Sequence, residues 1–120
     1  MIKTWEEYCE ETNMDSSILP DVSRLPEKMG RRTIARIKLE LMTAHINPKD
    51  YVPNWDDWDE YKWIPVFYMG GSGGFRFYYS SAYYDVYAGA GAGSAFCLKT
   101  KSRSDHAGKY WVDLYKEAMS

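Results

Sequence analysis

"KWIPVFYMGGSGGFRFYYSSAYYDVY", residues 62–87, decides the fold that we predict for this chain. Two runs rich in aromatic residues, 62–69 and 75–87, flank the glycine-rich segment 70–74. Such a pattern is typical of a β-hairpin. A third run, "SAFCLKT" at 94–100, follows a second glycine cluster. The sequence therefore predicts three antiparallel strands joined by two glycine-rich hairpin loops.

Helical patterns lie on both sides of these strands. Thr4 and Glu7 have the spacing of a capping box, which predicts a short helix from Trp5 to Thr12. Pro26 suits the first position of a longer helix ending at Ile46. Two adjacent apolar stripes make this the central helix of the core: Ile34, Ile37 and Leu41, and Ala35, Leu39, Met42 and Ile46.

A last helix is expected at the C-terminus, with Ser104 as its cap. Its apolar stripe consists of Ala107, Trp111, Leu114, Tyr115 and Ala118. The predicted fold is therefore α+β, a small three-stranded antiparallel sheet packed by about three helices in the order α-α-β-β-β-α. A chain of 120 residues is long enough for one core, so we expect a single domain over 1–120.

Composition limits the partners and the compartment. The formal net charge is −2, so any contact with a polyanion must be a local patch. Two isolated cysteines fit a reducing compartment, and a disulfide between them is the alternative. No secretory signal and no apolar run of about 20 residues is present. We therefore expect a cytoplasmic protein that does not enter the membrane.

The aromatic strand supplies the first candidate site. Strand alternation places Arg76, Tyr78 and Tyr84 on one face and the phenylalanines on the other, which we expect to cover the helices. Arg76 would pair a phosphate, and Tyr78 or Tyr84 would stack a base. The alternative is a sheet whose tyrosine hydroxyls simply face water.

Two basic sets are further candidates for anion binding. Lys99, Lys101 and Arg103 precede a predicted helix N-terminus, which attracts anions, although a solvated loop is the simpler interpretation. A second set decorates the central helix and is the best feature for a nucleic-acid-binding function: Lys28, Arg31, Arg32, Arg36 and Lys38.

The remaining polar residues do not predict an enzyme or a metal site. His45 and His106 lack zinc-ligand spacing, and Cys97 has the setting of a core residue. The acidic cluster lacks the pattern of an EF-hand loop and favours a helix-start or salt-bridge role: Asp56, Asp57, Asp59 and Glu60. We accordingly predict no catalytic residues, no metal and no cofactor.

Longer stretches carry a resemblance that covers nearly the whole chain. "NWDDWDEYKWIPVFYM", "SAFCLKTKSRSDHAGKYWVDLYKEAM", "KTWEEYCEET" and "LPDVSRLPEKM" resemble a family of small proteins in phages and prophages of Bacteroidales. This chain departs from the family in "SRSDHAGKYW", where a longer acidic helix start is usual. The resemblance implies a phage context and no particular activity.

Together these features predict a phage-encoded, non-enzymatic binding protein. The main hypothesis is a sponge that sequesters a nucleotide-type immune signal of the host, with rings stacking the ligand and glycines letting the hairpin close. The alternatives are an inhibitor that binds a host defence protein directly and a small nucleic-acid-binding module. We also expect a homo-oligomer, since short sheets leave open edges.

Overall fold

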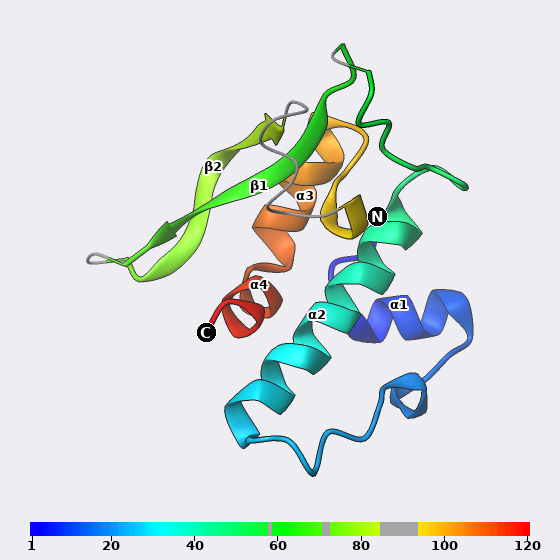
Figure 1. Cartoon of the computed structure of the whole chain (residues 1–120), viewed down its shortest axis with the longest axis vertical. Helices are drawn as coiled ribbons and strands as arrows, with labels where there is room; N and C mark the ends of the chain where they lie inside the picture. The colour runs from blue at the N-terminus through cyan, green and yellow to red at the C-terminus, as the bar shows by residue number, and fades with distance from the viewer. Residues whose placement is uncertain (58, 71–72, 85–93) are drawn as a thin grey trace.

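The computed structural model describes residues 1–57, 59–70, 73–84 and 94–120, without the side chains at 69, 79–84 and 94. Figure 1 shows the arrangement of the elements. Along the chain these are α1 (Trp5–Thr12), the 3-10 helix η1 (Ser16–Ile18), α2 (Glu27–Ile46), β1 (Lys62–Met69), β2 (Phe75–Tyr84), the 3-10 helix η3 (Ser94–Phe96), α3 (Lys101–Tyr110) and α4 (Val112–Ala118).

The fold is α+β, as predicted, but the described sheet has two antiparallel strands. In the register, Tyr68 lies opposite Arg76 and Lys62 lies opposite Tyr84, with an irregularity between Pro65 and Phe67. The third strand predicted at 94–100 is wrong. This segment forms η3 and a single bridge between Leu98 and Trp63. The predicted continuation of β2 over 85–87 and the glycine cluster 89–93 lie outside the described residues.

The C-terminal helix differs from its prediction at both its start and its middle. Thr100, not Ser104, is the N-cap, because the Thr100 hydroxyl accepts a hydrogen bond from the Arg103 N–H at 3.2 Å. Ser104 is fully buried inside α3. At Trp111 the backbone leaves helical geometry and separates α3 from α4. The described residues therefore hold four α-helices instead of about three, and the order of helices and strands is α-α-β-β-α-α.

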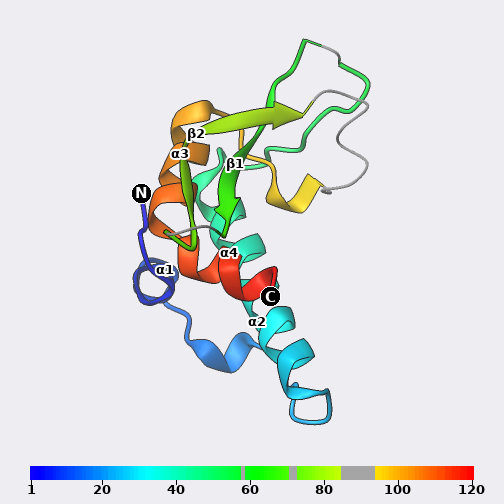
Figure 2. The ribbon, with the colours of Figure 1, turned by 90° about the vertical axis from the view of Figure 1, so that its left-hand side faces the viewer.

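The Thr4 cap of α1 and one apolar stripe of α2 are confirmed, whereas Pro26 is the N-cap of α2 and not its first helical residue, and the second stripe, Ile34, Ile37 and Leu41, is only partly buried. The Thr4 hydroxyl accepts from the Glu7 N–H, while the Glu7 carboxylate accepts from the N–H of Lys3, one residue before the position expected for a capping box. On α2, one predicted stripe forms the centre of the core: Ala35, Leu39, Met42 and Ile46. Helix α2 thus contacts α1, α4 and η3 along its length, as Figures 1 and 2 show.

The sheet packs on α3 through an unusually close approach at Gly108. A Cβ atom at this position would clash with ring carbons of Phe77 and lie 2.9 Å from the Cβ of Pro65. Next to this contact, the ring of Phe67 stacks on Phe75 at 4.9 Å and tilts against Tyr115 of α4 at 4.8 Å. The phenylalanine-bearing face therefore covers the helices, as expected from the sequence.

We predict that Gly108→Ala destabilises the protein by about 1–3 kcal/mol, because the added methyl group cannot enter the contact without displacing Phe77. A loss of stability would be informative, because a glycine-to-alanine change at an open helical position instead stabilises a protein by about 1 kcal/mol. Urea unfolding of Gly108→Ala, Phe77→Leu and the double variant measures the coupling. Additive losses would show that the methyl group and the ring do not compete for space.

Trp111 gives a second prediction for the core. Its side chain is only 2% exposed, and its indole N–H donates to the Ile2 carbonyl at 3.1 Å, which ties the N-terminus to the junction of α3 and α4. Trp111→Ala should reduce the free energy of unfolding by about 3–5 kcal/mol. The neighbouring Tyr110, 38% exposed, is the matched control. An equal loss in Tyr110→Ala and Trp111→Ala would contradict this packing.

Candidate functional site

The face of the hairpin turned away from the helices carries three side chains in contact with one another. We call Tyr68, Arg76 and Tyr78 the outer hairpin face. The guanidinium carbon of Arg76 lies 4.2 Å from the centre of the Tyr68 ring. The rings of Tyr68 and Tyr78 meet edge-on with centroids 4.9 Å apart. The strand register that pairs Tyr68 with Arg76 therefore builds a cation–π contact with a second ring beside it.

The loop between the strands holds the Arg76 guanidinium in place. Its Nη1 atom donates to the carbonyls of Gly74 at 3.1 Å and Gly70 at 3.4 Å. Both glycines have a positive φ, 65° at Gly74 and 143° at Gly70, which side chains rarely tolerate. A Cβ at Gly73 would crowd the guanidinium, with Nε only 2.9 Å away. The described glycines of this loop thus supply the carbonyls that bind the Arg76 guanidinium and leave space for it.

Arg76 and its ring partner remain accessible to a binding partner. Arg76 is exposed and the Tyr68 side chain is 37% exposed. Toward the described residues, Arg76 hydrogen-bonds through Nη1 alone. Its Nε and Nη2 groups can therefore donate to a carboxylate or phosphate, for which a planar guanidinium is well suited.

The structure does not bring all predicted site residues together. Tyr84 lies at the opposite end of β2 from Arg76, eight residues away, which in a strand is on the order of 20 Å. The Tyr84 side chain lies outside the described residues. Arg76 and Tyr78 are neighbours on one face, whereas Arg76 and Tyr84 are too far apart to hold the phosphate and base of one nucleotide.

The basic set at the start of α3 is also separate from the outer hairpin face. Leu98, next to Lys99, bridges to Trp63 at the far end of β1 from Tyr68. Lys101 forms an ion pair with Asp105 at 2.7 Å. Arg103 donates from Nε to the Ile46 carbonyl at 2.7 Å, which joins α3 to the end of α2. Of this set, the exposed Lys99 has the side chain best placed to meet a ligand.

Lys62 is a buried lysine that the sequence patterns did not predict. Lys62 is completely buried, with Nζ donating to the carbonyls of Asp57 at 3.1 Å and Glu60 at 3.0 Å. The same Nζ lies 3.5 Å from the Glu60 carboxylate and over the Trp55 ring. The salt-bridge role expected for the acidic cluster is thereby confirmed at Glu60. The signal was a lysine two residues after Glu60 and at the first position of the predicted strand.

Burial changes the titration of two groups in this region. Burial raises the pKa of the Cys97 thiol to about 11. Burial, with a smaller contribution from the negative charge of Glu60, raises the pKa of Tyr51 to about 12. Cys9 and Cys97 are not joined by a disulfide, and Cys97 is a core residue, as its setting in the sequence indicated. A thiol with so high a pKa is a poor nucleophile at neutral pH.

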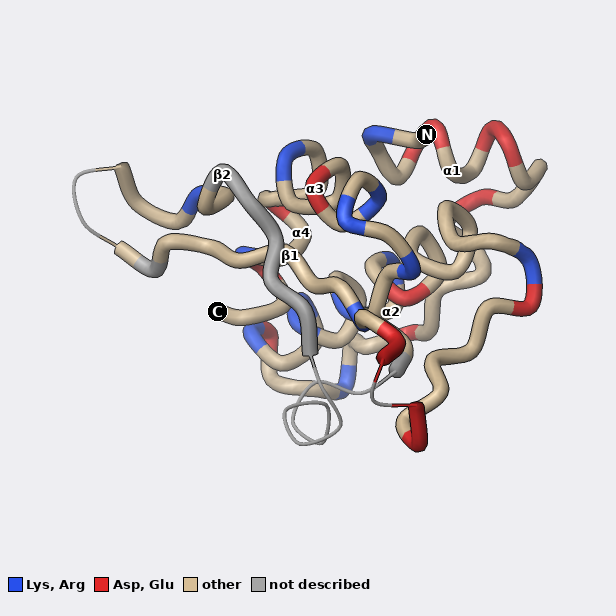
Figure 3. Tube along the Cα trace, turned by 90° about the horizontal axis from the view of Figure 1, so that it is seen from above, with Lys and Arg blue, Asp and Glu red and all other residues tan. Residues whose placement is uncertain are grey.

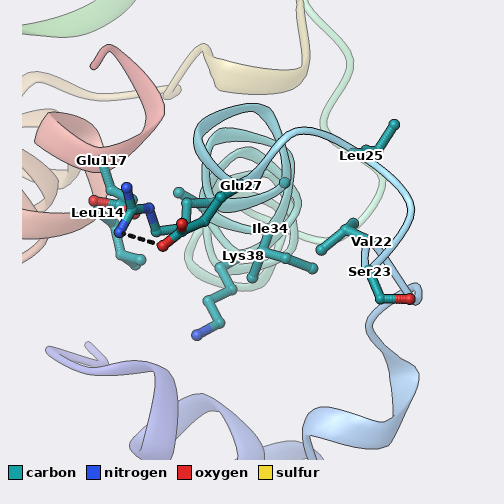
Figure 4. A pocket seen from close by; sticks show the side chains of 11 residues that line it. Val22, Ser23, Leu25, Glu27, Ile34, Lys38, Leu114 and Glu117 are labelled. Atoms are coloured by element: carbon teal, nitrogen blue, oxygen red, sulfur yellow. Dashed lines mark ion pairs between the residues drawn. The ribbon is translucent and has the colours of Figure 1, made fainter.

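Two cavities are formed by described residues, one along α2 and one beside the hairpin loop. A groove of about 480 Å³ runs along α2 and is lined partly by Val22, Ile34 and Leu114 (Figure 4). A smaller cavity of about 190 Å³ adjoins Gly70 and the C-terminus. Neither of these two cavities, formed by described residues, contains Arg76 or Tyr78.

Among the described residues, the charged and potential metal-binding side chains do not indicate a further site. Figure 3 shows basic residues spread over α2, α3 and β2, with acidic residues between them and along α1. In the described part of the chain, no group of three or more His, Cys, Asp and Glu is placed to hold a metal ion. Among the described helices, none has the length and apolar character needed to cross a membrane.

Comparisons of the chain with protein-family models, with curated proteins and with solved structures find no match. The resemblance to phage and prophage proteins and the cytoplasmic location therefore stay predictions.

The buried thiol and phenol generate a prediction about alkaline stability. A raised pKa means that the folded protein holds its proton more tightly than the unfolded chain, so this stability is lost as the pH rises. For Cys97 the loss runs from about pH 9 to pH 11 and amounts to about 1–3 kcal/mol. Urea unfolding of the protein and of Cys97→Ala across this range measures it. Identical slopes for both proteins would contradict the assignment to Cys97.

Proposed function

We propose that this protein is a non-enzymatic binding protein that recognises a partner protein through its outer hairpin face. The observation that carries the proposal is the exposed Arg76 guanidinium, stacked on Tyr68 and fixed by loop carbonyls. Tyrosine and arginine are the residue types that contribute most at protein interfaces. Here the two side chains already contact each other in the free protein, which reduces the entropy cost of ordering them on binding.

The chemistry of Arg76 defines what the partner offers. With Nη1 bound to the loop, Nε and Nη2 point their N–H groups at a planar acceptor with two oxygens. We therefore propose that an aspartate or glutamate of the partner pairs with Arg76, while an apolar or aromatic side chain packs on Tyr68 and Tyr78. Such an arrangement combines a charge-assisted hydrogen bond with ring burial.

The exposure of Arg76 and Tyr68 favours a protein over a nucleotide as the ligand of the outer hairpin face. Small ligands bind in concave sites of about 300–1,000 Å³, and neither described cavity includes Arg76 or Tyr78. The separation of Arg76 from Tyr84 and from the basic set at α3 points the same way. In the phage context that the resemblance implies, the partner is a host defence protein, and the nucleotide sponge becomes the alternative.

Photo-cross-linking tests this proposal. A benzophenone amino acid replaces Tyr68 in one protein and, as a control, the similarly exposed Tyr110 of α3 in another. Both proteins are produced in Bacteroidales cells, and the cross-linked peptides are identified by mass spectrometry. We expect one host protein to cross-link at position 68 and not at 110, through a segment that contains aspartate or glutamate.

Titration calorimetry with the purified host protein then measures the contribution of each side chain. We expect Tyr68→Ala and Arg76→Lys each to weaken binding by about tenfold or more, because lysine keeps the charge but not the two-pronged donor. Tyr110→Ala should bind like the unaltered protein. Unchanged affinity in the first two variants would overturn the proposal. Binding of a cyclic dinucleotide or an ADP-ribose derivative, without any cross-link at 68, would favour the sponge.

A further inference from the structure

The groove along α2 is a second surface, formed without any residue of the outer hairpin face. Its floor is one side of α2, from Glu27 to Lys38, a length of about 16 Å. The segment 22–25 forms one wall, and Leu114 and Glu117 of α4 form the other (Figure 4). Apolar side chains from three separate parts of the chain thus face a shared open space.

Tight local packing preforms this groove. A Cβ at Gly30 would lie 3.0 Å from a methyl group of Val22, so the loop rests directly on the helix. At the inner end, the Lys38 ammonium lies 5.3 Å from the centre of the Trp5 ring, which connects the groove to α1. At the outer end, the Glu27 side chain is largely solvent-exposed. The groove is therefore open at one end of α2 and limited by α1 toward the other.

The rim of the groove carries balanced charge. Arg31 lies between two carboxylates, 3.4 Å from Glu27 and 3.5 Å from Glu117. Lys38 adds a second cation, so the lining holds two acidic and two basic side chains. A rim of this kind does not select an acidic or a basic partner. It is instead complementary to a surface with the same mixture of charges.

We propose that the occupant of this groove is a second copy of the chain. A two-fold symmetric contact requires one patch to offer both the projection and the recess. Leu25, 40% exposed, projects at the edge of the same groove that Val22, Ile34 and Leu114 line. A two-fold axis across this patch places Leu25 of each copy over the groove of the other and sets cations against carboxylates. Figures 1 and 2 show the first turns of α2 extending beyond the neighbouring helices, which leaves room for this approach.

Sedimentation velocity tests the contact with a matched pair of variants. Leu25→Glu places a charge in the groove contact, whereas Met29→Glu places it at a residue that is 46% exposed and outside the groove lining. Helical periodicity puts Met29 on the far side of α2 from Arg31 and Lys38. We expect the unaltered protein and Met29→Glu to form a dimer of 14.0 kDa chains in the micromolar range. Leu25→Glu should weaken dimerisation by about tenfold or more.

Three results would overturn the proposal. They are a monomer at all concentrations of the unaltered protein, equal dimerisation of Leu25→Glu and Met29→Glu, and a dimer that dissociates on Tyr68→Ala but not on Leu25→Glu. Circular dichroism and melting curves establish first that both glutamate variants are folded, and the sedimentation of the two variants is compared afterwards. Failure here leaves the hairpin proposal standing, because partner binding to the outer hairpin face is measured with variants of Tyr68 and Arg76.

Discussion

The absence of a side chain at Gly108 is the constraint on which the orientation of the hairpin depends. Only a glycine lets the Phe77 ring and Pro65 approach the backbone of α3 this closely. Because alternate residues of a strand point to opposite faces, seating Phe77 on α3 turns Arg76 and Tyr78 outward. A core contact thereby determines which side chains meet a partner. The same alternation in β2 therefore determines both the packing of Phe77 on α3 and the residues that the outer hairpin face presents.

The glycine-rich loop has a different role in the structure from the one that the sequence suggested. From the sequence, the run of glycines suggested a flexible hairpin that closes over a ligand. In the structure, the carbonyls of Gly70 and Gly74 bind Arg76, and Gly73 leaves space for the guanidinium. These described glycines organise an arginine of the protein itself. A fixed guanidinium above a tyrosine ring is better matched to a rigid protein surface than to a loop that encloses a small molecule.

Local patterns predicted the parts of the fold that depend on neighbouring residues. The hairpin strands, the cap at Thr4 and the buried stripe of α2 follow from periodicity and turn chemistry. The break at Trp111 could not be predicted in this way, because it accompanies a hydrogen bond to Ile2, far away in the sequence. The segment around Leu98 likewise has strand composition, yet it makes only one bridge to β1. At the site, alternation placed Arg76 and Tyr78 on the outer face. Alternation alone did not predict Tyr68, because the position of Tyr68 beside Arg76 depends on how β1 pairs with β2.

Hydroxyl-radical footprinting of the tyrosines tests directly whether the outer hairpin face binds the partner, since it reports which rings solvent reaches before and after a partner binds. We predict that Tyr68 is oxidised readily in the free protein, that the buried Tyr115 is protected throughout, and that Tyr110 reacts equally in both states. On addition of the cross-linked host protein, Tyr68 should become protected while Tyr110 does not. A Tyr68 that is already protected in the free protein, or that stays equally reactive in the complex, would contradict the assignment of the outer hairpin face as the binding surface.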